Sequence, residues 1–202
     1  MNFLAHLHLA LPTDASRVGA LLGDFVRGTP EFLRTIHPHD LVEGIMLHRA
    51  IDRFTDDHPV FRECKSLLAP SRRRFAGIVI DLFFDHLLCK TWENYSMQSL
   101  PDFIEEVHAT LQRRRHWLPS DVSPVIESLI EQNWLATYET IPGLALTLNR
   151  VSKRRPFLAS IDGAESDLME NLEAFSDAFD RFYPELVSFA RQEKAGGAFN
   201  SP

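Results

Sequence analysis

Residues 78–88 read Ile-Val-Ile-Asp-Leu-Phe-Phe-Asp-His-Leu-Leu. This segment carries apolar side chains on nearly every side of a helix, so we expect it to lie deep in the fold, within a helix over residues 71–92. A carboxylate in such surroundings must be paired, protonated or bound to a metal, because an isolated buried charge is strongly unfavourable. Asp81, Asp85 and His86 are therefore the first residues to which we look for chemistry.

The rest of the chain shows the same helical character. Apolar residues recur at helical spacing, and prolines and glycines separate the segments. Residues 4–9 partly alternate Leu and His, which fits a short strand as well as a helix. We predict an all-α, single-domain helical bundle over residues 1–195 and a flexible tail over 196–202. Besides 71–92, helices are expected over residues 14–27, 38–55, 61–68, 101–115, 124–138, 142–155 and 165–192.

Composition limits the protein class. The 202 residues, 45% of them apolar, suffice for one hydrophobic core. Cys64 and Cys89 form no paired framework, and no run approaches the roughly 20 apolar residues of a membrane span. We expect a cytoplasmic protein without a membrane segment, and nothing in the sequence predicts its oligomeric state.

Three basic triplets stand out against a net charge of −7. If they gather on one face, they form a docking patch for a polyanion. Alternatively, each is a solvated helix end, because cations favour the last turn of a helix. The negative net charge and the lack of interleaved aromatic residues argue against nucleic acid. The triplets are Arg72-Arg73-Arg74, Arg113-Arg114-Arg115 and Lys153-Arg154-Arg155.

Six residues of the first 90 are expected metal ligands: His6, Asp24, His48, Asp52, Asp85 and His86. One helical turn separates His48 from Asp52, so both side chains point the same way. Mixed imidazole and carboxylate ligands suit a divalent cation such as Mn, Fe, Zn or Mg. Such an ion lowers the pKa of a bound water, which indicates a hydrolase. The alternative is that the buried carboxylates are only ion-paired, as in a non-catalytic helical adaptor.

Residues 23–28 read Gly-Asp-Phe-Val-Arg-Gly. Asp24 is a candidate ligand or base, and the planar fork of Arg27 is suited to holding two phosphate oxygens. The flanking glycines indicate close backbone approach or a special turn. The alternative is a surface ion pair between Asp24 and Arg27.

Taken together, these motifs resemble the acyl carrier protein phosphodiesterases, and the resemblance covers most of the chain. The motifs that carry it are Met-Asn-Phe-Leu-Ala-His-Leu-His-Leu-Ala at the start, residues 23–28, Gly44-x-x-x-His48-Arg49-x-Ile51-Asp52-x-Phe54-Thr55-Asp56, and Asp81-x-x-x-Asp85-His86. The resemblance implies an all-helical, HD-domain-like fold. HD-type phosphohydrolases carry His-Asp in that order, whereas the adjacent pair here is Asp85-His86.

The resemblance also implies an activity, namely hydrolysis of holo-acyl carrier protein to the apo protein and 4′-phosphopantetheine with Mn²⁺, or Mg²⁺ or Fe²⁺ in its place. Asp24 matches an aspartate on which the family's activity depends. Arg27 would offset charge on the phosphoryl oxygens, while a histidine such as His86 or a bound water would protonate the leaving serine oxygen. The basic triplets would then attract the acidic carrier protein. The alternative activity is that of an HD-type nucleotidase or cyclic phosphodiesterase acting on a small phosphate ester.

Overall fold

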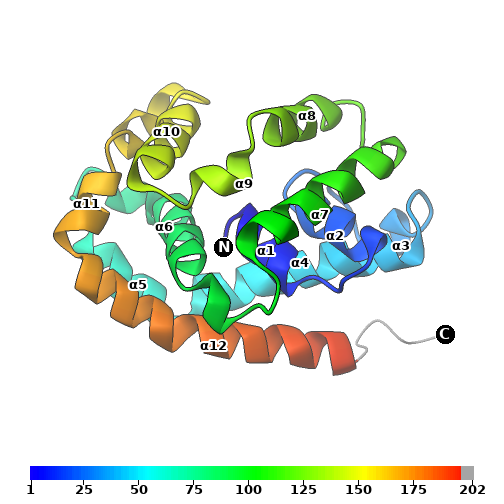
Figure 1. Ribbon diagram of the computed structural model, residues 1–202, viewed down its shortest axis with the longest axis horizontal. Coiled ribbons are helices and arrows are strands. Elements are labelled where there is room, and N and C mark those ends of the chain that lie inside the picture. Colours follow the sequence, from blue (N-terminus) through cyan, green and yellow to red (C-terminus); the bar gives the residue numbers. More distant parts are fainter. Residues whose placement is uncertain (197–202) are drawn as a thin grey trace.

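The computed structural model describes residues 1–196, and within them the fold is all-α, as predicted (Figure 1). The predicted tail lies outside the described residues except for Gly196, which ends the last helix. No helix in the described part is both long and apolar enough to cross a membrane. The α-helices are α1 (Phe3–Leu9), α2 (Asp14–Leu22), α3 (Pro30–Leu33), α4 (His39–Asp57), α5 (Pro59–Leu67), α6 (Ala76–Lys90), α7 (Leu100–Arg113), α8 (Ser123–Glu131), α9 (Trp134–Thr137), α10 (Ile141–Ser152), α11 (Glu165–Glu170) and α12 (Leu172–Gly196). Short 3₁₀ helices cover Arg73–Phe75, Trp92–Asn94, Arg115–Trp117 and Pro156–Ile161.

Several expected helices are interrupted or shortened. The expected helix over 124–138 is two helices, α8 and α9, because Asn133 adopts a left-handed conformation with φ of 47° between them. The expected helix over 165–192 is likewise divided at Asn171 into α11 and α12. α2 ends at Leu22, five residues before Arg27, and the amides of Phe25 and Val26 both donate to the carbonyl of Leu22. The segment after Leu22 is therefore a turn.

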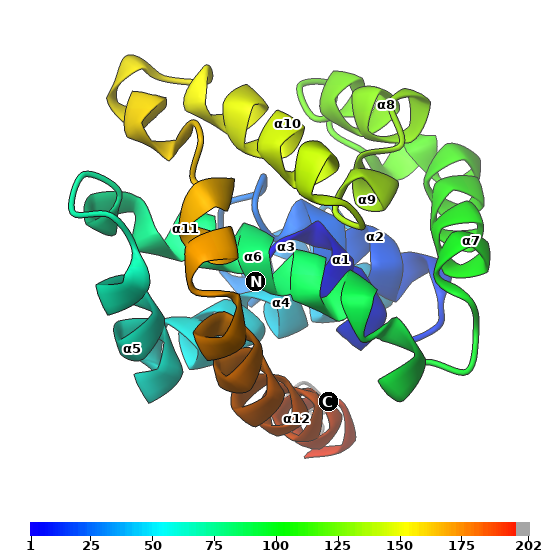
Figure 2. The same ribbon diagram turned by 60° about the vertical axis from the view of Figure 1, so that its left-hand side comes forward.

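The first segment, which fitted either a strand or a helix, is helix α1, and it lies in the middle of the molecule. In Figures 1 and 2 it is surrounded by longer helices, and its contacts are mainly with α2 and α6. All its residues except His8 are buried. The apolar segment 78–88 belongs to α6 and is mostly buried, as its composition predicts. Buried apolar residues from Met1 to Ala190 form one cluster, so α1 and α6 share a single core.

α2 and α4 approach each other closely through a pair of glycines. A Cβ atom on Gly44 of α4 would lie 2.6 Å from the carbonyl oxygen of Ser16, and one on Gly19 of α2 would overlap the carbonyl oxygen of Leu41. Both obstacles are backbone atoms, which cannot rotate away. The absence of these two side chains therefore lets the two helix backbones meet, and α4 thereby packs along α2.

We predict that Gly44→Ala destabilises the protein, because the added methyl group forces α2 and α4 apart. Overpacking of this kind costs about 1–3 kcal/mol, measurable as a lower free energy of unfolding in urea. Gly77→Ala is the matched control, since Gly77 lies in a helix with nothing within 4 Å of an added Cβ. Equal stability of the two variants would contradict the close contact.

Candidate metal centre

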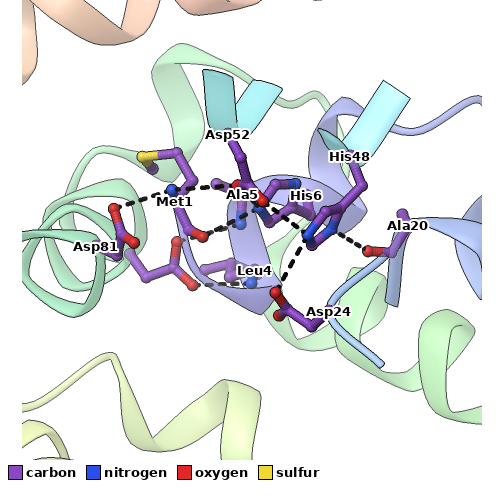
Figure 3. Close-up of polar contacts among 10 residues, drawn as sticks. Met1, Leu4, Ala5, His6, Ala20, Asp24, His48, Asp52 and Asp81 are labelled. Carbon is purple, nitrogen blue, oxygen red and sulfur yellow. Dashed lines mark hydrogen bonds and ion pairs between the residues drawn. The ribbon is translucent and has the colours of Figure 1, made fainter. Parts of the chain in front are cut away.

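Three side chains converge where α1 crosses α4. His6 of α1 and His48 and Asp52 of α4 offer ligand atoms within 4.8 Å of one another, an arrangement that can hold a metal ion. The Oδ1 atom of Asp52 lies 3.1 Å from Nε2 of His6, and its Oδ2 atom lies 3.0 Å from Nε2 of His48. The two imidazole rings stack with centroids 3.7 Å apart. Figure 3 shows these side chains converging, with Asp24 approaching His48 from the other side.

A hydrogen bond to the backbone fixes the orientation of the His48 ring. Its Nδ1 atom lies 2.7 Å from the carbonyl oxygen of Ala20, near the end of α2, and therefore donates its proton there. A Cβ atom on Gly23 would overlap this ring, so only glycine leaves room for it. Hydrogen bonding of the rear nitrogen to a carbonyl is the usual way in which a protein presents the other nitrogen to a metal.

The buried Nε2 atom of His48 shows whether a cation fits between the side chains. Its Nε2 atom is buried and makes no hydrogen bond of acceptable geometry, although Asp52 and Asp24 place carboxylate oxygens 3.0 and 3.3 Å away. With the ring proton on Nδ1, this nitrogen is an acceptor that faces two acceptors. That arrangement is stable only when a cation, either a proton or a metal ion, lies between them. The residues present therefore fit a divalent metal.

The pKa values of these side chains also indicate that His48 needs a cation on Nε2. Burial lowers the pKa of His48, but the carboxylates of Asp24 and Asp52 outweigh it and raise the pKa to about 9. Burial and the neighbouring charge of His48 lower the pKa of His6 to about 4. Burial raises the pKa of Asp52, yet the two imidazoles hold it well below its ordinary value. We call the group of His6, His48 and Asp52 the cluster. Without a metal, the cluster therefore holds a proton on His48.

Asp24 and Arg27 lie on the turn after α2, beside a hollow that we call the arginine pocket. The hollow is lined by Gly23, Asp24, Val26, Arg27, Gly28, Arg49, Asp52 and Arg53. Its volume is about 540 Å³. Arg49 of α4 donates to the carbonyls of Gly28 and Val26 at 2.8 and 3.0 Å and so ties the turn to α4. The roles of Ala20 and Arg49 were not expected from the sequence, whereas the glycines at 23 and 28 had indicated a close backbone approach or a special turn.

Asp85 lies outside the cluster and has another partner. Its fully buried carboxylate accepts hydrogen bonds from the backbone amides of Leu4 and Ala5 at 2.8 and 3.3 Å. These amides are at the first turn of α1, where helix N–H groups lack partners. Burial raises the pKa of Asp85 to about 7, and the two hydrogen bonds from these amides partly oppose that rise. Asp81 lies one turn earlier on α6, 2.9 Å from the amino group of Met1 (Figure 3). Both aspartates thus hold the segment that carries His6.

His86 also lies outside the cluster. Its Nδ1 atom is 2.7 Å from the carbonyl oxygen of Tyr138, just after α9. Adjacent residues on a helix point about 100° apart, so Asp85 can face α1 while His86 faces α9. Of the six expected ligands, the structure therefore brings together His6, His48 and Asp52, with Asp24 next to them, and leaves Asp85 and His86 apart.

The basic triplets occur at helix ends and are largely engaged within the protein. Arg72 pairs with Asp167 at 2.7 Å. Arg113 and Arg114 both bind Asp14, at 2.6 and 2.7 Å. Arg73 donates to the carbonyls of Leu68 and Ser66, whereas the Arg115 guanidinium lies 3.9 Å from a carboxylate of Glu127. The triplets adjoin helix ends, but Arg72, Arg113 and Arg114 are paired within the protein and not simply solvated, and a docking role for the triplets stays a prediction.

Comparison with known proteins places this arrangement in a family. The family model described as acyl carrier protein phosphodiesterase matches residues 1–186. Among curated relatives, the acyl carrier protein phosphodiesterase of Yersinia enterocolitica is 35% identical over 195 residues, covering 96% of this chain and all of the relative. Those of Photorhabdus laumondii and an Enterobacter species are 35% and 36% identical, each over 96% of this chain and over 96% and 100% of the relative. No solved structure matches, so the expected HD-like arrangement stays a prediction.

An all-α protein with a cluster of imidazole and carboxylate groups is thus similar, over nearly its whole length, to phosphodiesterases. The chain belongs to the acyl carrier protein phosphodiesterase family. The expectation that it is a phosphoric diester hydrolase is confirmed by this membership.

We predict that Gly23→Ala weakens binding of a divalent cation, because the added methyl group displaces the ring of His48. Loss of correct ligand support typically lowers metal affinity about 10- to 100-fold. Isothermal titration calorimetry with Mn²⁺ measures the change, and circular dichroism checks the fold. Gly77→Ala again serves as the control, and unchanged affinity in Gly23→Ala would show that the ring is not a ligand.

Proposed function

We propose that this protein hydrolyses holo-acyl carrier protein to apo-acyl carrier protein and 4′-phosphopantetheine, using a divalent metal ion held by His6, His48 and Asp52. The observation that carries the metal requirement is the buried Nε2 atom of His48, an acceptor facing the carboxylates of Asp24 and Asp52. Family membership supports the substrate, since the curated relatives are named for it.

The donor set supports an ion of intermediate hardness. Two imidazoles and one or two carboxylates suit Mn²⁺ or Fe²⁺, whereas Mg²⁺ prefers oxygen ligands. We choose Mn²⁺, the ion that the resemblance implies. A bound divalent ion would act as a Lewis acid that offsets charge on the phosphoryl oxygens and lowers the pKa of water.

The side chains around the cluster supply positioning and charge. Asp24 is ionised, because the pKa of its carboxyl group is lowered by His48 despite the opposing effect of burial. It lies 3.3 Å from Nε2 of His48, where it can serve as a further ligand or accept a proton from the attacking water. Arg27, on the same turn, faces the arginine pocket and can hold phosphate oxygens as charge develops on them. We assign no catalytic role to His86, since its side chain lies outside the group formed by His6, His48 and Asp52.

The test is incubation of the purified protein with holo-acyl carrier protein and Mn²⁺, followed by mass spectrometry of the carrier. We expect the carrier to lose its prosthetic group, and we expect Asp24→Ala and His48→Gln each to lower kcat/KM about 100-fold or more. Asp57→Asn is the matched control, because Asp57 is an exposed aspartate near the end of α4.

A chelator such as EDTA should abolish the reaction, and added Mn²⁺ should restore it. A panel of nucleotides and cyclic nucleotides separates the proposal from the small-ester alternative. Efficient cleavage of those esters without any change in carrier mass would contradict the proposed substrate.

Metal affinity should also depend on pH. The proton that His48 carries in the metal-free protein, with a pKa of about 9, must leave before its Nε2 atom can bind an ion. Affinity for Mn²⁺ should therefore rise with pH between about 6 and 8, by up to about tenfold per pH unit, and level off near 9. His6 adds no further slope there, because its pKa of about 4 leaves it neutral. Calorimetric titrations across this range measure the slope, and a flat profile would contradict the proton displacement.

A further inference from the structure

The cluster lies at the junction of two hollows. The first is the arginine pocket, and the second, which we call the α6/α10 cleft, has a volume of about 340 Å³. The residues common to both hollows are Asp24 and Asp52. The cleft is lined by Asp24, Asp52, Asp56, Met1, Asn2, Phe3, Ile78, Asp81, Leu82, Trp134, Tyr138, Thr147, Val151, Arg154 and Leu158.

The two hollows differ in depth. In the arginine pocket, Asp24, Arg27, Gly28 and Arg53 are exposed, so it is a shallow, polar surface beside the cluster. In the cleft, Leu82, Tyr138, Val151 and Leu158 are buried and Trp134 is half-buried. The cleft thus has the enclosed apolar wall and the size of a small-molecule site. Figures 1 and 2 show α10 beside α6.

The two hollows differ more in charge than in depth. The arginine pocket joins three guanidinium groups to the two shared carboxylates, and Arg27 and Arg53 are free to face solvent. The cleft combines the same two carboxylates with Asp56 and Asp81, against the guanidinium of Arg154 and the amino group of Met1, which pairs with Asp81. An acidic macromolecule is attracted to the first hollow and repelled by the second. An uncharged chain enters the second hollow without electrostatic repulsion.

A phosphodiester has two organic substituents, and a phosphorus atom beside Asp24 and Asp52 must direct them into different spaces. In the proposed substrate, one substituent is a strongly acidic protein, and the other is an uncharged chain of methyl, amide and thiol groups. The cleft offers apolar walls for the methyl groups and the guanidinium of Arg154 as a donor to the amide carbonyls. The two hollows therefore match the two substituents one to one.

We propose that the arginine pocket receives the acidic carrier protein, with Arg53 as a specificity residue, and that the α6/α10 cleft receives the pantetheine arm. This assignment rests on the proposed function. It places the carrier on the surface of the turn 23–28 and α4, and not on the basic triplets. It also makes Ile78, which is 39% exposed and lines the cleft, the residue at which the cleft can be narrowed without disturbing the core.

The experiment compares Arg53→Glu with Ile78→Trp in metal-loaded protein. Calorimetry measures the affinity for 4′-phosphopantetheine and for inorganic phosphate, and their ratio isolates the contribution of the arm. We expect Ile78→Trp to reduce this ratio about tenfold, and Arg53→Glu to leave it within about twofold. Arg53→Glu should instead lower kcat/KM on holo-acyl carrier protein about tenfold and flatten its salt dependence.

Two control variants carry the same chemical changes elsewhere. Leu146→Trp adds an indole at an exposed position of α10 outside the cleft, and Arg191→Glu reverses an exposed charge on α12. Both should match the unaltered protein in every measurement. A Leu146→Trp variant as impaired as Ile78→Trp would overturn the assignment of the cleft.

Other outcomes would overturn the proposal directly. Equal affinity of the unaltered protein for phosphate and 4′-phosphopantetheine would show that the arm has no site. A reduced ratio in Arg53→Glu, with none in Ile78→Trp, would reverse the assignment. Failure of the unaltered protein to cleave holo-acyl carrier protein would refute the proposed function instead, because the binding ratio requires no turnover.

Discussion

The arrangement of the cluster depends on one buried contact, the carboxylate of Asp85 with the first amides of α1. A seven-residue helix is too short to be stable by itself, and α1 is held by tertiary contacts at its N-terminal end. The contact satisfies two N–H groups that would otherwise be buried without partners, which would cost about 1–3 kcal/mol each. It fixes the start of the helix, so His6, one turn further on, faces α4. The apolar contacts of α1 with α2 and α6 hold the helix in the core, and the Asp85 contact fixes its first turn.

This contact also explains how far the site could be predicted from the sequence. A buried carboxylate was correctly expected to need a partner, but the sequence cannot show that the partner is the backbone of a distant helix. The pair His48 and Asp52 was visible because one helical turn relates them, and His6 was expected beside them as a ligand, which is where the structure places it. Asp85 binds backbone amides that lack partners because they begin helix α1. The alternation of Leu and His did not decide whether this segment is a helix or a strand, so these amides could not be identified from the sequence.

The fold was predictable at the level of helices and less so at their ends. Apolar periodicity located the segments, but it continues unbroken through Asn133 and Asn171, where the backbone changes direction. α2 stops at Leu22 although Phe25 and Val26 continue its apolar pattern, because both amides turn back to one carbonyl. The predicted break was placed at Gly28, which has a φ of 127° and does lie in a turn. Gly28 thus indicated that the segment after α2 is irregular, but it did not indicate that the helix ends at Leu22.

The tie between Arg49 and the turn 23–28 has a consequence for the arginine pocket. One guanidinium spans the carbonyls of Val26 and Gly28, and hydrogen bonds to a charged group contribute about 1.5–3 kcal/mol each. Swinging the turn outward would break both hydrogen bonds, so this tie opposes independent movement of the turn and helps to keep the arginine pocket in its observed shape.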